Sequence, residues 1–94
     1  MLSVRISRFE WDEGNIGHIA RHNIEPDEAE EVFANFPLYR RAKTNRMAAY
    51  GQTDGGRYLF VVFERKPSGV IRVVTAREMS LSERRCYRRM KGER

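Results

Sequence analysis

The sequence predicts a small α+β domain with the element order β-α-α-β-β-β-β-α, in which helices pack against an antiparallel sheet. Two stretches with helical periodicity precede position 38, and residues 38–76 hold β-branched and aromatic runs separated by turn-forming residues. An arginine-rich stretch with a helix-capping sequence then follows. With 94 residues, the chain is expected to form a single domain, residues 1–94.

The N-terminal third predicts a strand and two helices. Residues 4–11 alternate weakly, and Asp12 is suited to cap a helix over residues 13–22, after which Asn23 can adopt the left-handed conformation that ends a helix. Pro26 suits the first position of a second helix, and Pro37 ends it because the residue before a proline is disfavoured in the α region. The apolar spacing of this helix predicts one buried face, formed by Ala29, Val32, Phe33 and Phe36.

The middle of the chain predicts four strands, over residues 38–43, 47–53, 58–63 and 70–76. Turn-forming residues separate them at 44–46, 54–56 and 66–69, where glycine or asparagine can supply positive φ. The run 58–63 is apolar at both parities, which predicts a central strand covered on both faces.

The last helix begins with Ser80-Leu81-Ser82-Glu83, a capping-box sequence. On a helical wheel Cys86, Tyr87 and Met90 share an arc with Glu83, and the opposite arc is cationic. Cations three and four residues apart repel each other, which an anionic partner would relieve. A solvated cationic face is the alternative interpretation. The basic residues of this arc are Arg84, Arg85, Arg88, Arg89 and Lys91.

Charge is distributed unevenly along the chain. Residues 1–37 hold 3 basic and 8 acidic residues, a net charge of −5, whereas residues 38–94 hold 15 basic and 5 acidic residues, a net charge of +10. The basic part suits a polyanion such as RNA. The single cysteine excludes an intrachain disulfide and a zinc site built from thiolates, and no apolar run approaches the ~20 residues of a membrane span. We therefore expect a soluble cytoplasmic protein.

Few residues could carry chemistry. His18 and His22 lie one helical turn apart, but no third zinc ligand is evident, so no metal site is expected. His22 is either a half-buried imidazole bonded to a backbone carbonyl or a general acid or base.

Arg72 and Arg77 differ in strand parity, so they face opposite sides of the sheet unless a bulge intervenes or Arg77 lies beyond the strand end. Arg72 is either paired with a carboxylate such as Glu64 or directed at a ligand, whereas Arg77 is suited to hold a phosphate.

A set of arginine, lysine, histidine and tyrosine suits cleavage of RNA without a metal. In such a reaction the 2′-hydroxyl attacks the phosphorus, a base accepts its proton, and guanidinium groups stabilise the charge of the phosphorane.

A series of segments spread over nearly the whole chain matches one known family in the same order. The matching segments are Phe9-Glu10-Trp11-Asp12-Glu13, Asn15, His18-Ile19-Ala20-Arg21-His22, Glu28-Ala29-Glu30-Glu31-Val32-Phe33, Gly51, Thr53-Asp54, Gly56-Arg57, Ile71-Arg72-Val73-Val74-Thr75-Ala76-Arg77, Glu83-Arg84-Arg85 and Tyr87. In these segments the chain resembles the BrnT family, toxins of type II toxin–antitoxin modules, although Asn23 departs from the glycine of many members. The resemblance implies a RelE-like ribonuclease fold, RNA cleavage without a metal or other cofactor, and neutralisation by a ribbon-helix-helix antitoxin through which any DNA contact is made.

The leading hypothesis is therefore an endoribonuclease toxin that cleaves cellular RNA and arrests growth. The expected catalytic residues are His22, Arg72 and Arg77, and the expected substrate-binding residues are Arg21, Arg84 and Arg88. The alternative is a non-catalytic basic module that binds nucleic acid or acts as a corepressor with a DNA-binding partner. The acidic second helix is a candidate site for a further antitoxin segment.

Overall fold

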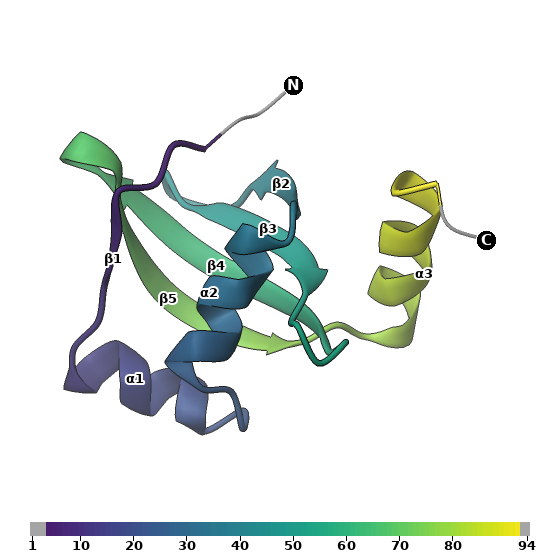
Figure 1. Ribbon diagram of the computed structural model, residues 1–94, viewed down its shortest axis with the longest axis horizontal. Coiled ribbons are helices and arrows are strands. Elements are labelled where there is room, and N and C mark those ends of the chain that lie inside the picture. Colours follow the sequence, from purple (N-terminus) through teal and green to yellow (C-terminus); the bar gives the residue numbers. More distant parts are fainter. Residues whose placement is uncertain (1–3, 93–94) are drawn as a thin grey trace.

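The computed structural model describes residues 4–92 and has the predicted element order (Figure 1). A 3₁₀ turn, Pro67–Gly69, joins the last two strands. The helices and strands are β1 (Arg8–Glu10), α1 (Glu13–Ala20), α2 (Pro26–Ala34), β2 (Leu38–Arg41), β3 (Met47–Gln52), β4 (Tyr58–Lys66), β5 (Val70–Glu78) and α3 (Leu81–Met90).

The five strands form one sheet in the order β1-β5-β4-β3-β2. β1 runs parallel to β5, and the other neighbours are antiparallel. Helices α1 and α2 cover one face, whereas α3 stands apart from them at one end of the sheet (Figure 1). The core lies between the sheet and the first two helices, with Ile19, Val32, Leu59, Phe63 and Ile71 among its fully buried side chains. The face of the sheet away from this core is called the open face below.

Asn15 anchors α1 to the sheet. Its side chain caps the helix reciprocally with Asp12, as the sequence predicts for Asp12, and its Nδ2 also donates to the carbonyls of Glu10 and Val73 at 2.9 and 3.0 Å. The helix ends at Ala20, two residues earlier than expected, and Asn23 adopts the predicted left-handed conformation with φ 60°. This turn leaves the side chain of His22 outside the helix and exposed.

Helix α2 begins at Pro26 as predicted and buries Ala29, Val32 and Phe33. The expectation that Phe36 completes this face is wrong, because Phe36 is 82% exposed. The helix stops at Ala34, and Phe36 takes φ 54° before Pro37, which turns its side chain away from the core. Gly51 of β3 passes so close to this connection that a Cβ would lie 3.1 Å from atoms of Pro37 and Val32.

The β2–β3 hairpin turns where the sequence predicts it. Thr44 and Asn45 both have positive φ, 58° and 62°, as the two central residues of a tight hairpin turn require. The strand limits differ at several ends: β1 has three residues, and β5 continues to Glu78 instead of ending at position 76. The longer β5 holds Arg77 inside the sheet.

A β-bulge in β5 decides where its two arginines point. Val62 pairs with Thr75 and Phe63 pairs with Val73, which leaves Val74 as the extra residue. Because of this extra residue, Arg72 and Arg77 face the same side of the sheet. Both side chains point away from the core. The sequence predicted opposite sides unless a bulge intervened, and the bulge is present.

Candidate functional site

A row of four side chains crosses the open face beneath α3. Leu38 of β2 pairs with Tyr50 of β3, Tyr50 with Phe60 of β4, and Phe60 with Arg77 of β5. The rings of Tyr50 and Phe60 pack with their centroids 4.9 Å apart. Because neighbouring strands lie ~4.8 Å apart, this row places an apolar residue, two aromatic rings and a cation within about 15 Å.

Arg77 lies at the C-terminal end of β5 with its guanidinium 4.3 Å above the centre of the Phe60 ring. Its Nη1 and Nη2 donate to the two carboxylate oxygens of Glu83 at 2.8 and 2.9 Å, and Nη1 also donates to the carbonyl of Glu78. The bonds from Arg77, against the effect of burial, lower the pKa of Glu83 to about 2. Glu83 therefore occupies, as a permanent anion, the position that a phosphate oxygen pair would take on Arg77.

Helix α3 is held over the open face by polar and aromatic contacts. The predicted capping box is present: the Ser80 hydroxyl accepts from the Glu83 N–H, and the Glu83 carboxylate accepts from the Ser80 N–H. The Arg84 guanidinium lies 4.1 Å above the ring of Tyr58, which also meets Tyr87 edge-on. The predicted seam of Cys86, Tyr87 and Met90 faces the sheet, and Arg85 and Arg89 of the opposite arc are exposed.

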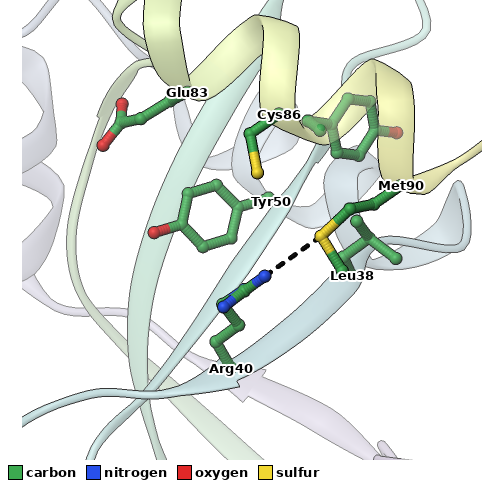
Figure 2. A pocket seen from close by; sticks show the side chains of 7 residues that line it. Leu38, Arg40, Tyr50, Glu83, Cys86 and Met90 are labelled. Atoms are coloured by element: carbon green, nitrogen blue, oxygen red, sulfur yellow. Dashed lines mark hydrogen bonds between the residues drawn. The ribbon is translucent and has the colours of Figure 1, made fainter.

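A pocket of about 210 Å³ lies between α3 and the open face (Figure 2). Leu38, Tyr50 and Arg40 line it from the sheet, and Cys86 and Met90 line it from the helix. Figure 2 shows the Tyr50 ring between the Cys86 thiol and the Arg40 guanidinium. The Glu83 carboxylate, which binds Arg77, forms part of the same lining. The pocket is therefore continuous with the surroundings of Arg77.

Arg72 lies in a different environment, near the start of β5. Its guanidinium donates to Asp12 at 2.8 Å and to Glu10 at 3.3 Å. Arg72 is therefore paired with carboxylates, one of the two predicted alternatives, but Glu64, the example given for such a partner, pairs with Arg46 instead. The hydrogen bond from Arg72 lowers the pKa of Asp12, and a bond from Lys66 does so for Glu10. Arg72 thus joins β5 to β1 and to the start of α1.

His22 and Arg21 lie in the exposed turn that follows α1. Arg21 is the C-cap of that helix, and the ring of His22 is 6.2 Å from that of His18 between centroids. Within residues 4–92, no hydrogen bond or ion pair links the His22 imidazole to Arg72 or Arg77. The imidazole is exposed and free of a carbonyl bond in this part of the chain, so the half-buried alternative does not apply.

Arg57, which sequence reasoning did not single out, ties the His22 turn to the end of β5. Its guanidinium donates to both carboxylate oxygens of Glu28 at 2.8 and 2.9 Å, to the Asn23 carbonyl at 3.0 Å, and to Glu78 at 2.9 Å. Partial burial acts to raise the pKa of Glu28, but the bonds from Arg57 and the Glu25 N–H lower it overall. The only sequence signal for Arg57 was its place after Gly56 in a matching segment.

Three of the four carboxylates of α2 are engaged within the chain. Besides Glu28, Glu30 accepts from the Trp11 indole at 2.8 Å, and Glu31 accepts from the Asp54 N–H at 2.9 Å. These bonds fix α2 to its neighbours. The same carboxylates were expected to bind a further antitoxin segment, so part of their charge is already paired within the chain.

The part of the chain that the structure describes has neither a metal-binding cluster nor a membrane-spanning helix. Within residues 4–92, no three His, Cys, Asp or Glu side chains gather closely enough to hold a metal ion. None of the helices in the same range is long and apolar enough to cross a membrane.

The fold and the site together define a small α+β domain whose open face presents cations and aromatic rings, a combination suited to nucleic acid. A profile of the family described as "Ribonuclease toxin, BrnT, of type II toxin-antitoxin system" matches residues 11–83, and the chain belongs to this family. Its fold is similar to the crystal structure of the Brucella abortus ribonuclease toxin BrnT, with 25% identity and a TM-score of 0.62 over 83% of this chain and 99% of that chain. No curated protein sequence matches the chain.

Family membership makes the chain a ribonuclease toxin of a type II toxin–antitoxin system and implies an RNA substrate and an antitoxin partner. The predicted family and fold class are confirmed. The residues that carry out the reaction remain predictions.

Proposed function

We propose that the chain is a metal-independent endoribonuclease that cleaves RNA through attack of the substrate's own 2′-hydroxyl. The observation that carries the proposal is the Arg57 guanidinium, which binds the Asn23 carbonyl and the Glu78 carboxylate. Asn23 adjoins His22 and Glu78 adjoins Arg77, so one cation fixes both candidate residues at the same end of the sheet.

In this mechanism His22 accepts the proton of the 2′-hydroxyl, and Arg77 donates to the phosphate oxygens as charge develops on them. Arg77 faces α3 and the His22 turn follows α1 on the other side of the sheet. Because the 2′-hydroxyl lies next to the phosphorus that it attacks, this mechanism requires both side chains to reach the same phosphate at this end of the sheet. The exposed imidazole is accessible to such a strand. The guanidinium supplies the positive charge that a metal ion supplies in other nucleases.

Arg21, Arg84 and Arg88 position the rest of the strand through its phosphates. Arg72 contributes less in this proposal than the sequence predicts, because Asp12 and Glu10 already neutralise it at the other end of β5.

We further propose that a ribbon-helix-helix antitoxin neutralises the toxin in the cytoplasm by covering the α3 side. Phe36 and Met90 are 82% and 53% exposed, and Lys91 next to Met90 donates to the Phe36 carbonyl. These apolar side chains therefore lie near each other at the C-terminal end of α3. A partner protein that covered them would also obstruct the pocket, because Met90 lines it.

The experiment that tests the proposed function uses purified chain, free of antitoxin, incubated with RNA and a chelator. His22→Ala should lose cleavage, and His18→Ala is the matched control because it is an exposed histidine four residues earlier, inside α1. General acid–base catalysis typically contributes ~10²–10⁴-fold, so the two variants should differ by about that factor. Equal rates for both variants would refute the role of His22. Intact RNA with the parent chain would instead favour a non-catalytic binding module.

A further inference from the structure

We propose that the pocket between α3 and the open face binds one nucleobase of the RNA, beside the phosphate that Arg77 holds. The inference rests on the proposed function in taking Arg77 as a phosphate contact, and it adds a base-binding subsite formed by Tyr50, Arg40, Leu38, Cys86 and Met90. The volume of about 210 Å³ is below the ~300–1,000 Å³ of pockets for drug-sized ligands, which suits a single ring system.

The position of the pocket follows from the sheet register. Tyr50 and Arg77 are both cross-strand partners of Phe60, so their backbones are two strand spacings apart, roughly 10 Å. A phosphate on the Arg77 guanidinium and a base beside Tyr50 are then separated by about the reach of one nucleotide. Glu83 connects the two places in the free protein, since it binds Arg77 and lines the pocket, and a phosphate on Arg77 would displace it.

The lining has the chemistry that single-stranded RNA recognition uses. Tyr50 offers an aromatic ring, and burial raises the pKa of its hydroxyl, which therefore remains a neutral hydrogen-bond donor. Leu38, Cys86 and Met90 supply apolar walls, and the unbranched thioether of Met90 can adapt to the shape of a ring. Stacking on an aromatic ring tolerates any base and is typically worth a factor of roughly 5 to 150 in affinity.

Arg40 supplies a donor that is not satisfied by a carboxylate within residues 4–92. Its Nη2 donates to the Met90 sulfur at 3.0 Å, and a thioether is a weak acceptor. A base oxygen or ring nitrogen at this position would be a better acceptor. Arg40 is in this respect unlike Arg57, Arg72 and Arg77, each of which already binds a carboxylate.

Cys86 makes occupancy of the pocket measurable. It is the only cysteine of the chain and lines the pocket, so alkylation by N-ethylmaleimide modifies a single position whose rate reports access. The probes are short 2′-O-methyl oligonucleotides, which lack the attacking hydroxyl, in an intact series and in a series that lacks the base at one position at a time. At saturation, intact strands should slow alkylation at least fivefold, and one abasic position should abolish most of that protection.

Two variants and a control connect this protection to the pocket. Tyr50→Ala should remove the difference between the intact strand and that abasic strand, and Arg40→Ala should reduce it. Arg40 is exposed, so its replacement keeps the test valid if Tyr50→Ala does not fold. Arg41→Ala is the matched control: the charge change and the strand are the same, but the side chain points to the other face of β2. It should keep the full difference.

Three outcomes would overturn the proposal. Equal protection by intact and abasic strands at every position would mean that phosphates alone shield Cys86. Equal protection by free nucleoside monophosphates at the same nucleotide concentration would assign the pocket to free nucleotides. Protection by the antitoxin with none by RNA would assign it to a protein side chain. A parent chain that binds these strands but cleaves no RNA would contradict the proposed function alone, because the alkylation assay requires no turnover.

Discussion

Each end of β5 carries an arginine, but the two arginines lie in different charge environments. Near the start of the strand, Arg72 binds Asp12 and Glu10, and Lys66 also binds Glu10, so two cations meet two anions. At the other end, Arg77 binds one carboxylate, Glu83, which belongs to a helix whose remaining charges are cationic. The first cluster is balanced within the chain, whereas the second has an excess of positive charge that a phosphate would neutralise.

The comparison also shows how structural and functional tasks are divided. Arg72 joins β5 to β1 and to the first helix. At the Arg77 end the equivalent task belongs to Arg57, which joins α2, the His22 turn and the end of β5. Arg77 does not join strands or helices in this way. It lies above the ring of Phe60 and pairs with Glu83 of α3.

Replacement of the two arginines should therefore have unequal effects on cleavage. Arg77→Ala should lower kcat/KM on the order of a hundredfold or more, the typical loss for one donor to transition-state charge. Arg72→Ala should lower it less than about tenfold, because its guanidinium is already neutralised. The measurement is a single-turnover cleavage assay with a chelator present.

Circular dichroism of both variants controls for folding. A loss for Arg72→Ala as large as that for Arg77→Ala would contradict the comparison and restore the catalytic role that the sequence assigns to Arg72.

The second largest effect concerns stability at the Arg77 end. Arg57→Ala removes a bidentate bond to Glu28, which is partly shielded from water, together with exposed bonds to Asn23 and Glu78. We expect a loss of about 1–2 kcal/mol in the free energy of unfolding, measured by urea titration. Arg46→Ala, which removes one exposed pair with Glu64, should cost less than about 0.5 kcal/mol. Equal losses would contradict the structural role of Arg57.

Much of the fold was predictable because its signals are local. Capping sequences marked the starts of α1 and α3, Pro26 marked the start of α2, and the hairpin turn fell at the expected residues. Phe36 was misassigned because the periodicity of an apolar face continues in the sequence after the backbone has left the helix at Ala34.

The candidate site was less predictable, because its geometry depends on contacts between distant residues. The bulge at Val74 arises from the pairing of β4 with β5, and nothing in the run from Ile71 to Ala76 marks the extra residue. The partners of Arg57 and Arg72 come from segments 21 to 62 positions away. Sequence identified Arg77 as a candidate phosphate contact, but the Phe60 ring beneath it required the sheet register.

A smaller effect should appear in the salt dependence of RNA binding. If Arg88 contacts a phosphate, Arg88→Ala should weaken binding only a few fold at moderate salt and reduce the slope of log K against log[salt] by about 0.7. Arg41→Ala, whose side chain lies on the face of β2 opposite Arg40, should leave the slope unchanged. Fluorescence anisotropy with a 2′-O-methyl strand measures both. An unchanged slope for Arg88→Ala would place the strand elsewhere on α3.

The smallest effect tests the carboxylate that Arg77 binds. The pKa of Glu83 is lowered from 4.5 to about 2, so the folded chain holds this carboxylate ionised where the unfolded chain would protonate it. Its contribution to stability is therefore complete above about pH 4.5 and is lost as pH falls towards 2. Glu83→Gln should lose about 1 kcal/mol at neutral pH, since Arg77 is 40% exposed, and should show a shallower decline of stability between pH 4.5 and 2. Arg77→Ala should flatten the same interval, because the cation that lowers the pKa is then absent. If neither variant changed the acid limb of the unfolding curve, the ion pair would not form in solution, and Arg77 would already be open to phosphate.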